Sequence, residues 1–203
     1  MILIGQLDSP FVRRVAMTLA IYDIPFERRG LSIFRNQDEV RAITPLGKVP
    51  ALQLDDGETL YDSHAIIDEI DARATPAACL TPAGGIERRH VLHTASIPLG
   101  LAEKSIAASS MYRQASGNMD EGWHARCLSQ IETALTWLAA RSDAAWFHGD
   151  AMTQADVAFT CAWGHVTARN PEVDAAGQFP GLAARAEAVE ALAAFRAHPF
   201  QED

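Results

Sequence analysis

The chain of 203 residues is long enough to bury a core, and its hydrophobic fraction of 48% is that of an ordinary globular protein. Residues 1–75 carry 8 basic and 12 acidic side chains and residues 76–203 carry 9 and 14, which gives −4 and −5 and a net charge of −9. Negative charge spread this evenly argues against nucleic acid or an anionic membrane as a partner.

No export or membrane signal is expected. The start of the chain lacks a basic segment and a long apolar segment, and no later stretch approaches the roughly 18 uncharged residues of a membrane helix. The three cysteines are far apart and outside any CxxC pattern, as expected for core residues in a reducing compartment: Cys79, Cys127 and Cys161. We therefore expect a cytoplasmic protein.

A short strand and a helix open the chain. Met1–Gly5 is an apolar run of β type, and Ser9 followed by Pro10 is the pattern of a helix N-cap and first turn. We expect the helix to end near Tyr22. Its apolar residues recur at helical spacing and its two arginines fall on the other side: Phe11, Val15, Leu19 and Tyr22 against Arg13 and Arg14.

The next elements complete a small α/β domain. Phe26–Arg29 is typical of a second strand, and Asn36–Ile43 predicts a short helix. Two more short strands follow, joined by a tight turn at Asp55–Gly57, and a helix begins at Ser63. The order β-α-β-α-β-β-α predicts one mixed sheet with helices on its faces over residues 1–75.

The loop before the third strand offers a peptide-binding edge. Pro50 opens that strand, so Val49 before it is left with unpaired backbone groups. If the bond between them is cis, the turn directs the Val49 amide and carbonyl into a cleft, where an extended peptide can pair with them. The helix beginning at Ser63 adds free amides and a positive dipole end that favour a carboxylate.

The rest of the chain is predicted to be helical. Residues 76–85 are rich in proline and glycine and form the expected linker to an all-helical domain over residues 86–203. Its expected helices are Ile86 to about Ser116, kinked before Pro98; Glu121–Arg141; one that starts with a capping box of Thr153 and Asp156 and reaches about Ala168; and Leu182–Ala197.

These patterns together resemble the cytosolic glutathione S-transferases. The resemblance is carried by Ser9–Val15, Pro45–Leu52, Asp62-Ser63, and Gly149-Asp150 with the Thr153–Asp156 box, which span most of the chain. It implies a thioredoxin-like N-terminal domain joined to an all-α domain. The Ser-Pro-Phe opening is most similar to the serine-type bacterial and plant tau-like branches.

The resemblance also implies a set of glutathione-binding residues and no metal. Val49, before Pro50, would pair with the cysteinyl part through its backbone. Asp62 would take the γ-glutamyl amine and Ser63 its carboxylate, while Lys48 would partner the glycyl carboxylate. The implied reaction adds the glutathione thiolate to a small apolar electrophile, as in detoxification.

Ser9 stands where thioredoxins carry a reactive cysteine, and residues 1–78 contain no cysteine, which excludes dithiol chemistry there. A serine hydroxyl can instead donate a hydrogen bond to the sulfur of bound glutathione. Lowering the thiol pKa from about 8.5 by about 2 units needs about 2.7 kcal/mol. A hydrogen bond to a charged acceptor and a helix N-terminus together supply that amount.

Simpler alternatives stay open at each position. Ser9 can be an N-cap only, with Asp8 as the nearest competitor for catalysis, and the Val49–Pro50 turn can be purely structural. The protein can be a non-catalytic binding or chaperone-like relative. It can also be a glutathione-dependent isomerase or dehalogenase, although the Ser-Ser-Cys opening of maleylacetoacetate-type isomerases is absent.

The second substrate and the partner are expected from the resemblance. The electrophile would lie between Phe11 and the kinked helix, near Ala108, Met111 and Tyr112. Family members usually dimerise through the first two helices of the helical domain, so we expect a homodimer. His90 and His93, three residues apart, are expected to be surface or packing residues rather than metal ligands.

Overall fold

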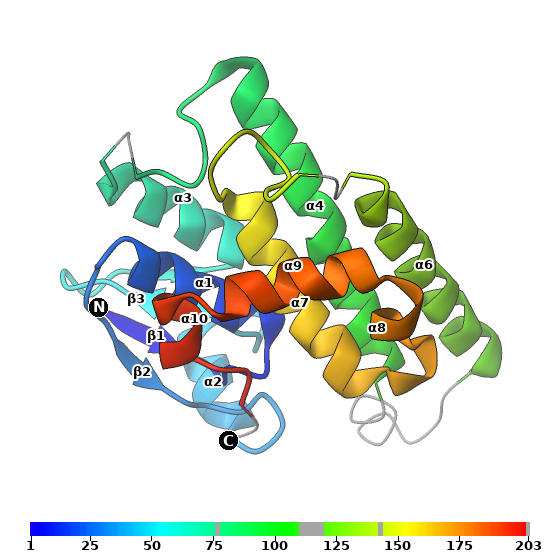
Figure 1. Cartoon of the computed structure of the whole chain (residues 1–203). Coiled ribbons are helices and arrows are strands. Elements are labelled where there is room, and N and C mark those ends of the chain that lie inside the picture. Colours follow the sequence, from blue (N-terminus) through cyan, green and yellow to red (C-terminus); the bar gives the residue numbers. More distant parts are fainter. Residues whose placement is uncertain (76–77, 110–119, 142–143, 202–203) are drawn as a thin grey trace. The chain divides into compact units, whose positions relative to one another are not determined.

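A computed structural model describes residues 1–75, 78–109, 120–141 and 144–201 (Figure 1). Contacts divide the chain into two units: unit 1 is Met1–Ala83 with Ala193–Asp203, and unit 2 is Gly84–Leu192. The C-terminal segment, expected to lie in the helical domain, therefore groups with unit 1.

Unit 1 contains one mixed four-stranded sheet in the order β2-β1-β3-β4, as predicted (Figure 1). β1 pairs with β2 in parallel and with β3 antiparallel, and β3 and β4 form the antiparallel hairpin. The elements are β1 Ile2–Ile4, α1 Pro10–Ile21, β2 Glu27–Arg29, α2 Gln37–Ile43, β3 Ala51–Gln53, β4 Thr59–Tyr61, α3 Ser63–Arg73 and, from the chain's end, α10 Ala193–Ala197.

The strands alternate between two apolar layers. Ile4 of β1 and Ala51 of β3 pair in register and pack with Val40 of α2 in one buried cluster. Leu3 and Leu52, also paired in register and fully buried, point to the opposite face, where α1 contacts β1 and α3 contacts β3. The sheet is therefore a central layer with helices on both faces.

Arg13 and Arg14, on the side of α1 away from its predicted apolar residues, do not face solvent. Both side chains are buried, with 0% and 2% of their surface exposed. The Nε of Arg13 donates to the carbonyl of His198 at 3.1 Å, and its guanidinium lies 5.4 Å from the ring centre of Phe195. Segments distant in sequence thus cover the side of α1 that its own pattern marks as polar.

The expected single helix Leu182–Ala197 is two helices. α9 ends at Glu190 and α10 begins at Ala193, with the Leu192 amide bonded to the carbonyl of Val189 three residues earlier. Phe195 is fully buried in unit 1, where α10 contacts α1. Packing, rather than a stop signal in this alanine-rich sequence, sets the break.

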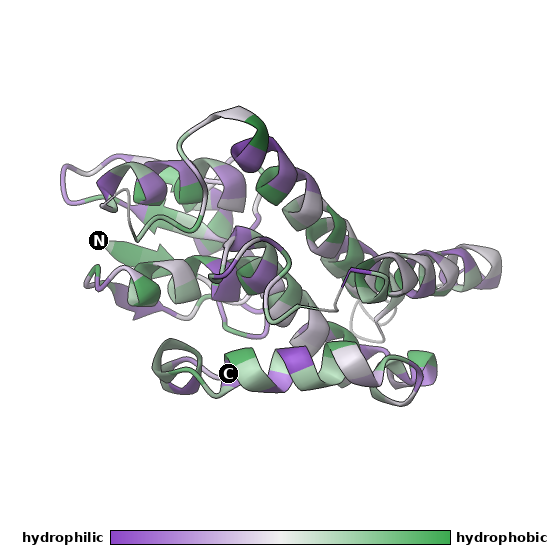
Figure 2. Cartoon of the chain, turned by 45° about the horizontal axis from the view of Figure 1, so that its top comes forward, coloured by the Kyte–Doolittle hydropathy of each residue, from purple (hydrophilic) through white to green (hydrophobic). Residues whose placement is uncertain are grey.

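Unit 2 is helical. Along its helices hydrophobic residues, green in Figure 2, alternate with hydrophilic residues, purple in the same view. α4 passes through Pro98 but ends at Ala108, earlier than the expected Ser116, and the Ser109 amide and hydroxyl both bond the Ile106 carbonyl. The elements are α4 Gly85–Ala108, α6 Glu121–Ala139, α7 Gln154–Arg169, the 3-10 turn η1 Pro171–Val173, α8 Ala175–Gln178 and α9 Pro180–Glu190.

The predicted capping box of α7 is confirmed. The Thr153 hydroxyl caps the helix, and the Thr153 amide donates to the Asp156 carboxylate at 2.9 Å. The buried Asp156 carboxylate also accepts from the Phe147 amide at 3.0 Å and from Arg185 of α9 at 3.2 Å. One carboxylate therefore fixes a helix start, the loop before it and a neighbouring helix.

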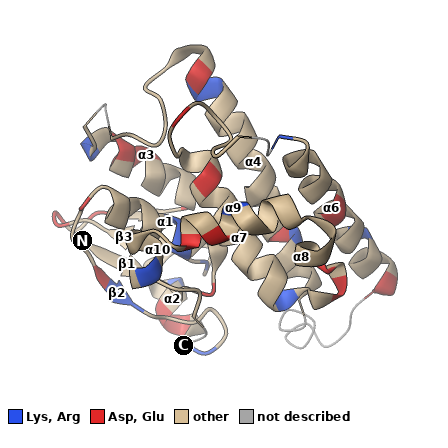
Figure 3. Ribbon diagram, in the orientation of Figure 1, with Lys and Arg blue, Asp and Glu red and all other residues tan. Residues whose placement is uncertain are grey.

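Charged side chains are distributed over the elements of each unit, with no long run of one sign (Figure 3). None of the helices in the described part of the chain has the length and apolar character needed to span a membrane.

Two of the three cysteines, Cys127 and Cys161, are buried as expected, whereas Cys79 is half-buried and donates to the Thr81 carbonyl.

A buried polar cluster joins α4 to α7 within unit 2. The Ser105 hydroxyl lies 2.6 Å from Nδ1 of His165 and also bonds the Asn170 side chain. Burial, followed by the charge of Arg169, lowers the pKa of His165 to about 4. The imidazole is therefore neutral in the folded protein at neutral pH.

This cluster predicts acid-sensitive stability. Because His165 takes up its proton near pH 6.5 when unfolded but only near pH 4 when folded, its stabilising contribution is complete above pH 6.5. That contribution is lost as the pH falls, by up to about 1.4 kcal/mol per pH unit. In urea unfolding between pH 7 and 4.5, His165→Gln should show a shallower pH dependence than the wild type. The exposed His93→Gln serves as the control, and equal slopes for wild type and His165→Gln would contradict the prediction.

Candidate functional site

The candidate site in unit 1 is built around Gly5 at the end of β1. Its φ of +131° is one that other residues rarely adopt, and a Cβ there would lie 2.5 Å from Cγ2 of Val12 and 3.0 Å from Cβ of Val49. The missing side chain therefore lets the first turn of α1 and the loop before β3 approach one another. Two of the predicted site segments meet here.

Ser9 caps α1 as the sequence predicts. Its Oγ accepts a long hydrogen bond from the Val12 amide at 3.4 Å, and its residue is half-buried. Capping uses only the acceptor capacity of the hydroxyl, and its O–H proton has no acceptor among the described residues. The cap and the proposed donor role are therefore compatible in one side chain.

The Val49–Pro50 peptide bond is cis. Val49 is half-buried, and neither its amide nor its carbonyl makes a hydrogen bond within the described ranges. The preceding turn is held by Thr44, whose hydroxyl accepts from the Lys48 amide and donates to the Lys48 carbonyl, both at 3.1 Å. This leaves the Lys48 side chain exposed beside an unpaired peptide edge.

Asp62 caps α3 with a backbone φ of +70°, a conformation that L residues seldom take. Its carboxylate accepts from the His64 amide at 2.8 Å and lies 2.9 Å from Nδ1 of the His64 ring. Burial raises the pKa of Asp62, but the two hydrogen bonds from His64 outweigh it and hold that pKa below its ordinary value. The sequence left the direction of His64 open; its ring turns toward Asp62.

Ser63 opens α3 and is 3% exposed. The structure also brings Arg14, which the sequence analysis did not place in the site, against Ser63. Nη1 of Arg14, on α1, lies 3.4 Å from the Ser63 hydroxyl oxygen and donates to it. Two adjacent arginines on a helix gave no signal of burial, because the surface that covers Arg14 includes the start of α3, 49 residues later.

Family models match both parts of the chain. That of the glutathione S-transferase N-terminal domain matches residues 3–78, and that of the C-terminal domain matches residues 121–184. A maleylacetoacetate isomerase of Pseudomonas aeruginosa is 30% identical over 161 residues, covering 71% of this chain and 71% of that protein. The chain belongs to the glutathione S-transferase family.

Solved structures agree with membership of the glutathione S-transferase family. One from Methylobacterium radiotolerans, in complex with glutathione sulfonate, is 25% identical, with a TM-score of 0.90 over 100% of this chain and 96% of its own. Another, from Methylobacillus flagellatus with glutathione bound, is 28% identical, with a TM-score of 0.89 over 97% and 98%. The predicted thioredoxin-like domain and helical domain are thereby confirmed.

The electrophile residues expected for a glutathione S-transferase are only partly visible. Phe11 is half-buried in the first turn of α1, and Ala108 is the last residue of α4. Met111 and Tyr112 lie outside the described residues. The electrophile pocket stays a prediction.

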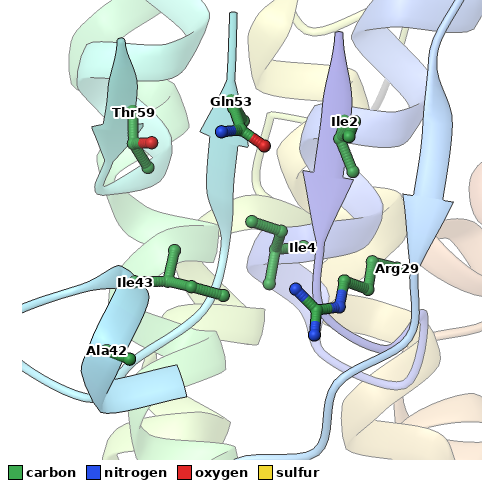
Figure 4. Close-up of a pocket in the computed structure, with 7 residues that line it drawn as sticks. All are labelled: Ile2, Ile4, Arg29, Ala42, Ile43, Gln53 and Thr59. Carbon is green, nitrogen blue, oxygen red and sulfur yellow. The ribbon is translucent and has the colours of Figure 1, made fainter. Parts of the chain in front are cut away.

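A cavity of about 280 Å³ lies elsewhere in unit 1, between the sheet and α2 (Figure 4). Its lining includes the apolar side chains of Ile4 and Ile43 and the polar side chains of Arg29 and Thr59. None of the predicted glutathione-binding residues lines this cavity. Because Arg29 is already paired with Glu39 at 2.7 Å, the cavity offers no unpaired charge to a peptide ligand.

The two histidines of α4 each contact another ring. His90 and His93 line a cavity of about 310 Å³ in unit 2, where the His90 ring stacks 6.4 Å from that of His148 and His93 lies edge-on to Trp137. No group of three metal-binding side chains was found among the described residues. Each of the two histidine rings therefore packs on a ring from another segment of unit 2.

The contact between His64 and Asp62 yields a prediction. His64→Ala removes the ring bond but keeps the backbone bond, so the pKa of Asp62 should rise toward its ordinary value of 3.8. A carboxyl ¹³C NMR titration measures this directly. His93→Ala, an exposed histidine in the other unit, is the control and should leave Asp62 unchanged. An unaltered Asp62 titration in His64→Ala would show that the ring contact has no energetic effect.

Proposed function

We propose that this glutathione S-transferase binds glutathione in unit 1, ionises its thiol with Ser9 and transfers the thiolate to a small apolar electrophile. The observation that carries the proposal is the Ser9 hydroxyl, which caps α1 with its lone pair and keeps its proton available. Val12, in the first turn of the same helix, and Val49 both lie against Gly5, which supports one site for Ser9 and the unpaired Val49 edge. The glutathione ligands of the two similar structures, from Methylobacterium and Methylobacillus, support glutathione as the co-substrate.

Each part of the tripeptide has a matching group in the proposed mode of binding. The backbone of Val49 pairs with the cysteinyl unit as an added strand. Asp62 takes the γ-glutamyl amine, since its lowered pKa keeps it charged, and Ser63 takes the neighbouring carboxylate. Lys48, exposed on its turn, reaches the glycyl carboxylate. Local positive groups are needed because the protein as a whole carries a charge of −9.

The Ser9 hydroxyl would act on the thiol equilibrium. A pKa lowered by about 2 units from about 8.5 raises the thiolate fraction at pH 7 roughly 25-fold. That gain is modest compared with enzymatic rate enhancements, so holding the electrophile beside the sulfur must contribute at least as much. Ser9 therefore prepares the nucleophile, while the pocket supplies proximity.

A glutathione-dependent isomerisation is the second candidate. The isomerase relative from Pseudomonas aeruginosa, 30% identical, favours it, whereas the absence of a Ser-Ser-Cys opening in this chain disfavours it. Both reactions begin with the same ionised thiol, so the two candidates share the glutathione site and differ in the second substrate. A purely structural relative would need neither the free Ser9 proton nor the Asp62–Ser63 pair.

We also propose a cytoplasmic homodimer that uses α4 and α6. Three large apolar side chains on these helices are exposed in the single chain, as expected for surfaces that meet a partner: Ile86, Leu92 and Trp123.

The experiment is a calorimetric titration of glutathione combined with thiolate absorbance from about pH 5 to 9, a range that brackets the expected shift. In the wild type the bound thiol should ionise at least about one unit lower than in Ser9→Ala, with at most a small change in affinity. Ser96→Ala, which removes a hydroxyl from the exposed face of α4, is the matched control.

Two results would contradict the proposal in different ways. Identical thiol titrations in wild type and Ser9→Ala would mean that Ser9 is only a helix cap and that another group ionises the thiol. The absence of glutathione binding in the wild type would remove the enzyme assignment itself.

A further inference from the structure

The cavity between the sheet of unit 1 and the end of α2 has an apolar floor and an apolar wall (Figure 4). Ile2 and Ile4 of β1 form the floor, and Ala42 and Ile43, the last two residues of α2, form the wall. Its volume of about 280 Å³ is close to the lower end of the range of about 300–1,000 Å³ for small-molecule sites. The cavity can therefore hold a small ligand with an apolar body.

Three polar side chains surround this floor and have unused hydrogen-bonding capacity. Thr59 and Gln53 pair in register on β4 and β3, and neither side chain makes a hydrogen bond within the described residues. Arg29, on β2 at the other side of the floor, donates one N–H to Glu39 at 2.7 Å and none to another acceptor in the described part of the chain. Each side of the cavity can thus bind an oxygen atom of a ligand.

The charge of the lining favours an uncharged ligand. Arg29 is the only charged residue among the seven that line the cavity, and Glu39, which pairs with it, also accepts from Asn36 at 3.0 Å. A ligand carboxylate would compete with Glu39, whereas a carbonyl oxygen can accept from the unused N–H groups of Arg29. A ligand hydroxyl can donate and accept at Gln53 and Thr59. The lining therefore fits an uncharged molecule with a carbonyl at one end and a hydroxyl at the other.

The wall of the cavity leads directly to the loop before β3. α2 ends at Ile43, and the next residue, Thr44, is 1% exposed and holds the turn through two hydrogen bonds of 3.1 Å to the backbone of Lys48. Ile43 and Val49 also pack against the same apolar cluster, which contains Ile4. Because a packed interior transmits small displacements, a ligand that fills the cavity would steady both the turn and the Val49 edge.

We propose that this cavity is an effector site for a small uncharged molecule with an apolar body, a hydroxyl and a carbonyl, and that its occupancy strengthens glutathione binding. The effect on glutathione rests on the proposed function, because it takes Val49 as the peptide-binding edge. An effector that has already ordered the turn lowers the conformational entropy that glutathione must still overcome. By linkage, glutathione strengthens the binding of the effector by the same factor.

The test uses methyl 3-(4-hydroxyphenyl)propanoate as the probe, because it is uncharged at neutral pH and is not an electrophile toward thiols. In a ¹H–¹⁵N NMR titration the probe should shift the amides of Ile4, Gln53 and Thr59. It should also slow hydrogen exchange of the Lys48 amide, which is bonded to the Thr44 hydroxyl. In calorimetry, saturating probe should strengthen glutathione binding about fivefold, at the lower end of typical couplings between sites.

Two variants link the effect to the cavity. Thr59→Val removes the hydroxyl and should weaken probe binding about fivefold, while binding of methyl 3-phenylpropanoate, which lacks the probe's hydroxyl, should change less than about twofold. Ala42→Leu adds a larger side chain to the cavity wall and should abolish binding of both esters. Ala176→Leu, at an exposed position of α8, is the matched control and should change neither.

Probe shifts confined to Ser9 and Phe11, in the first turn of α1, would overturn the proposal, as would the absence of any probe binding. Cavity binding with an unchanged glutathione affinity would refute the effector role. A wild type that binds the probe in the cavity but binds no glutathione would overturn the proposed function and the coupling with it. Exchange of the Lys48 amide would then still show whether the cavity acts on the turn, because that measurement needs no glutathione.

Discussion

The structure of the candidate site depends on one close approach, in which Val12 and Val49 both pack against Gly5. Any side chain at Gly5 would overlap Val12, and the φ of +131° would strain it as well. Through this contact the cap of α1 and the turn before β3 are held at the same end of β1. The Ser9 hydroxyl and the Val49 peptide edge can then serve one ligand, although 40 residues separate them in sequence.

The charges of the site explain how a protein with a net charge of −9 can favour an anionic peptide. In the proposed binding mode Asp62 partners the amine and Lys48, exposed on its turn, partners a carboxylate, so these ligand charges have opposite partners nearby. The field of the net negative charge repels an anionic ligand, but salt screens it over about 8 Å at physiological ionic strength. The local contacts act inside that distance. Specificity therefore comes from pairs of groups rather than from the overall charge.

Local patterns in the sequence predicted the parts of the fold and site that short-range physics determines. Four of these features depend on residues within a few positions of one another: the Ser9 cap, the Val49–Pro50 turn, the start of α3 and the Thr153–Asp156 capping box. What failed depended on distant packing. Arg13 is buried by residues near the C-terminus and Arg14 by α3, and α10 separates from α9 because Phe195 docks in unit 1. A helical-wheel pattern of 12 residues contains no information about those partners.

The most direct test of the account is a ¹H–¹⁵N NMR titration of the wild-type chain with glutathione. The backbone amides of Val49, Ser63 and Ala65 have no intramolecular acceptor within the described ranges and belong to the segments that we propose for the cysteinyl and γ-glutamyl groups. The account predicts that these three amides shift together with a single binding constant. Shifts confined to the cavity between the sheet and α2, or shifts of Val49 and Ser63 with different constants, would contradict a single peptide site at the end of β1.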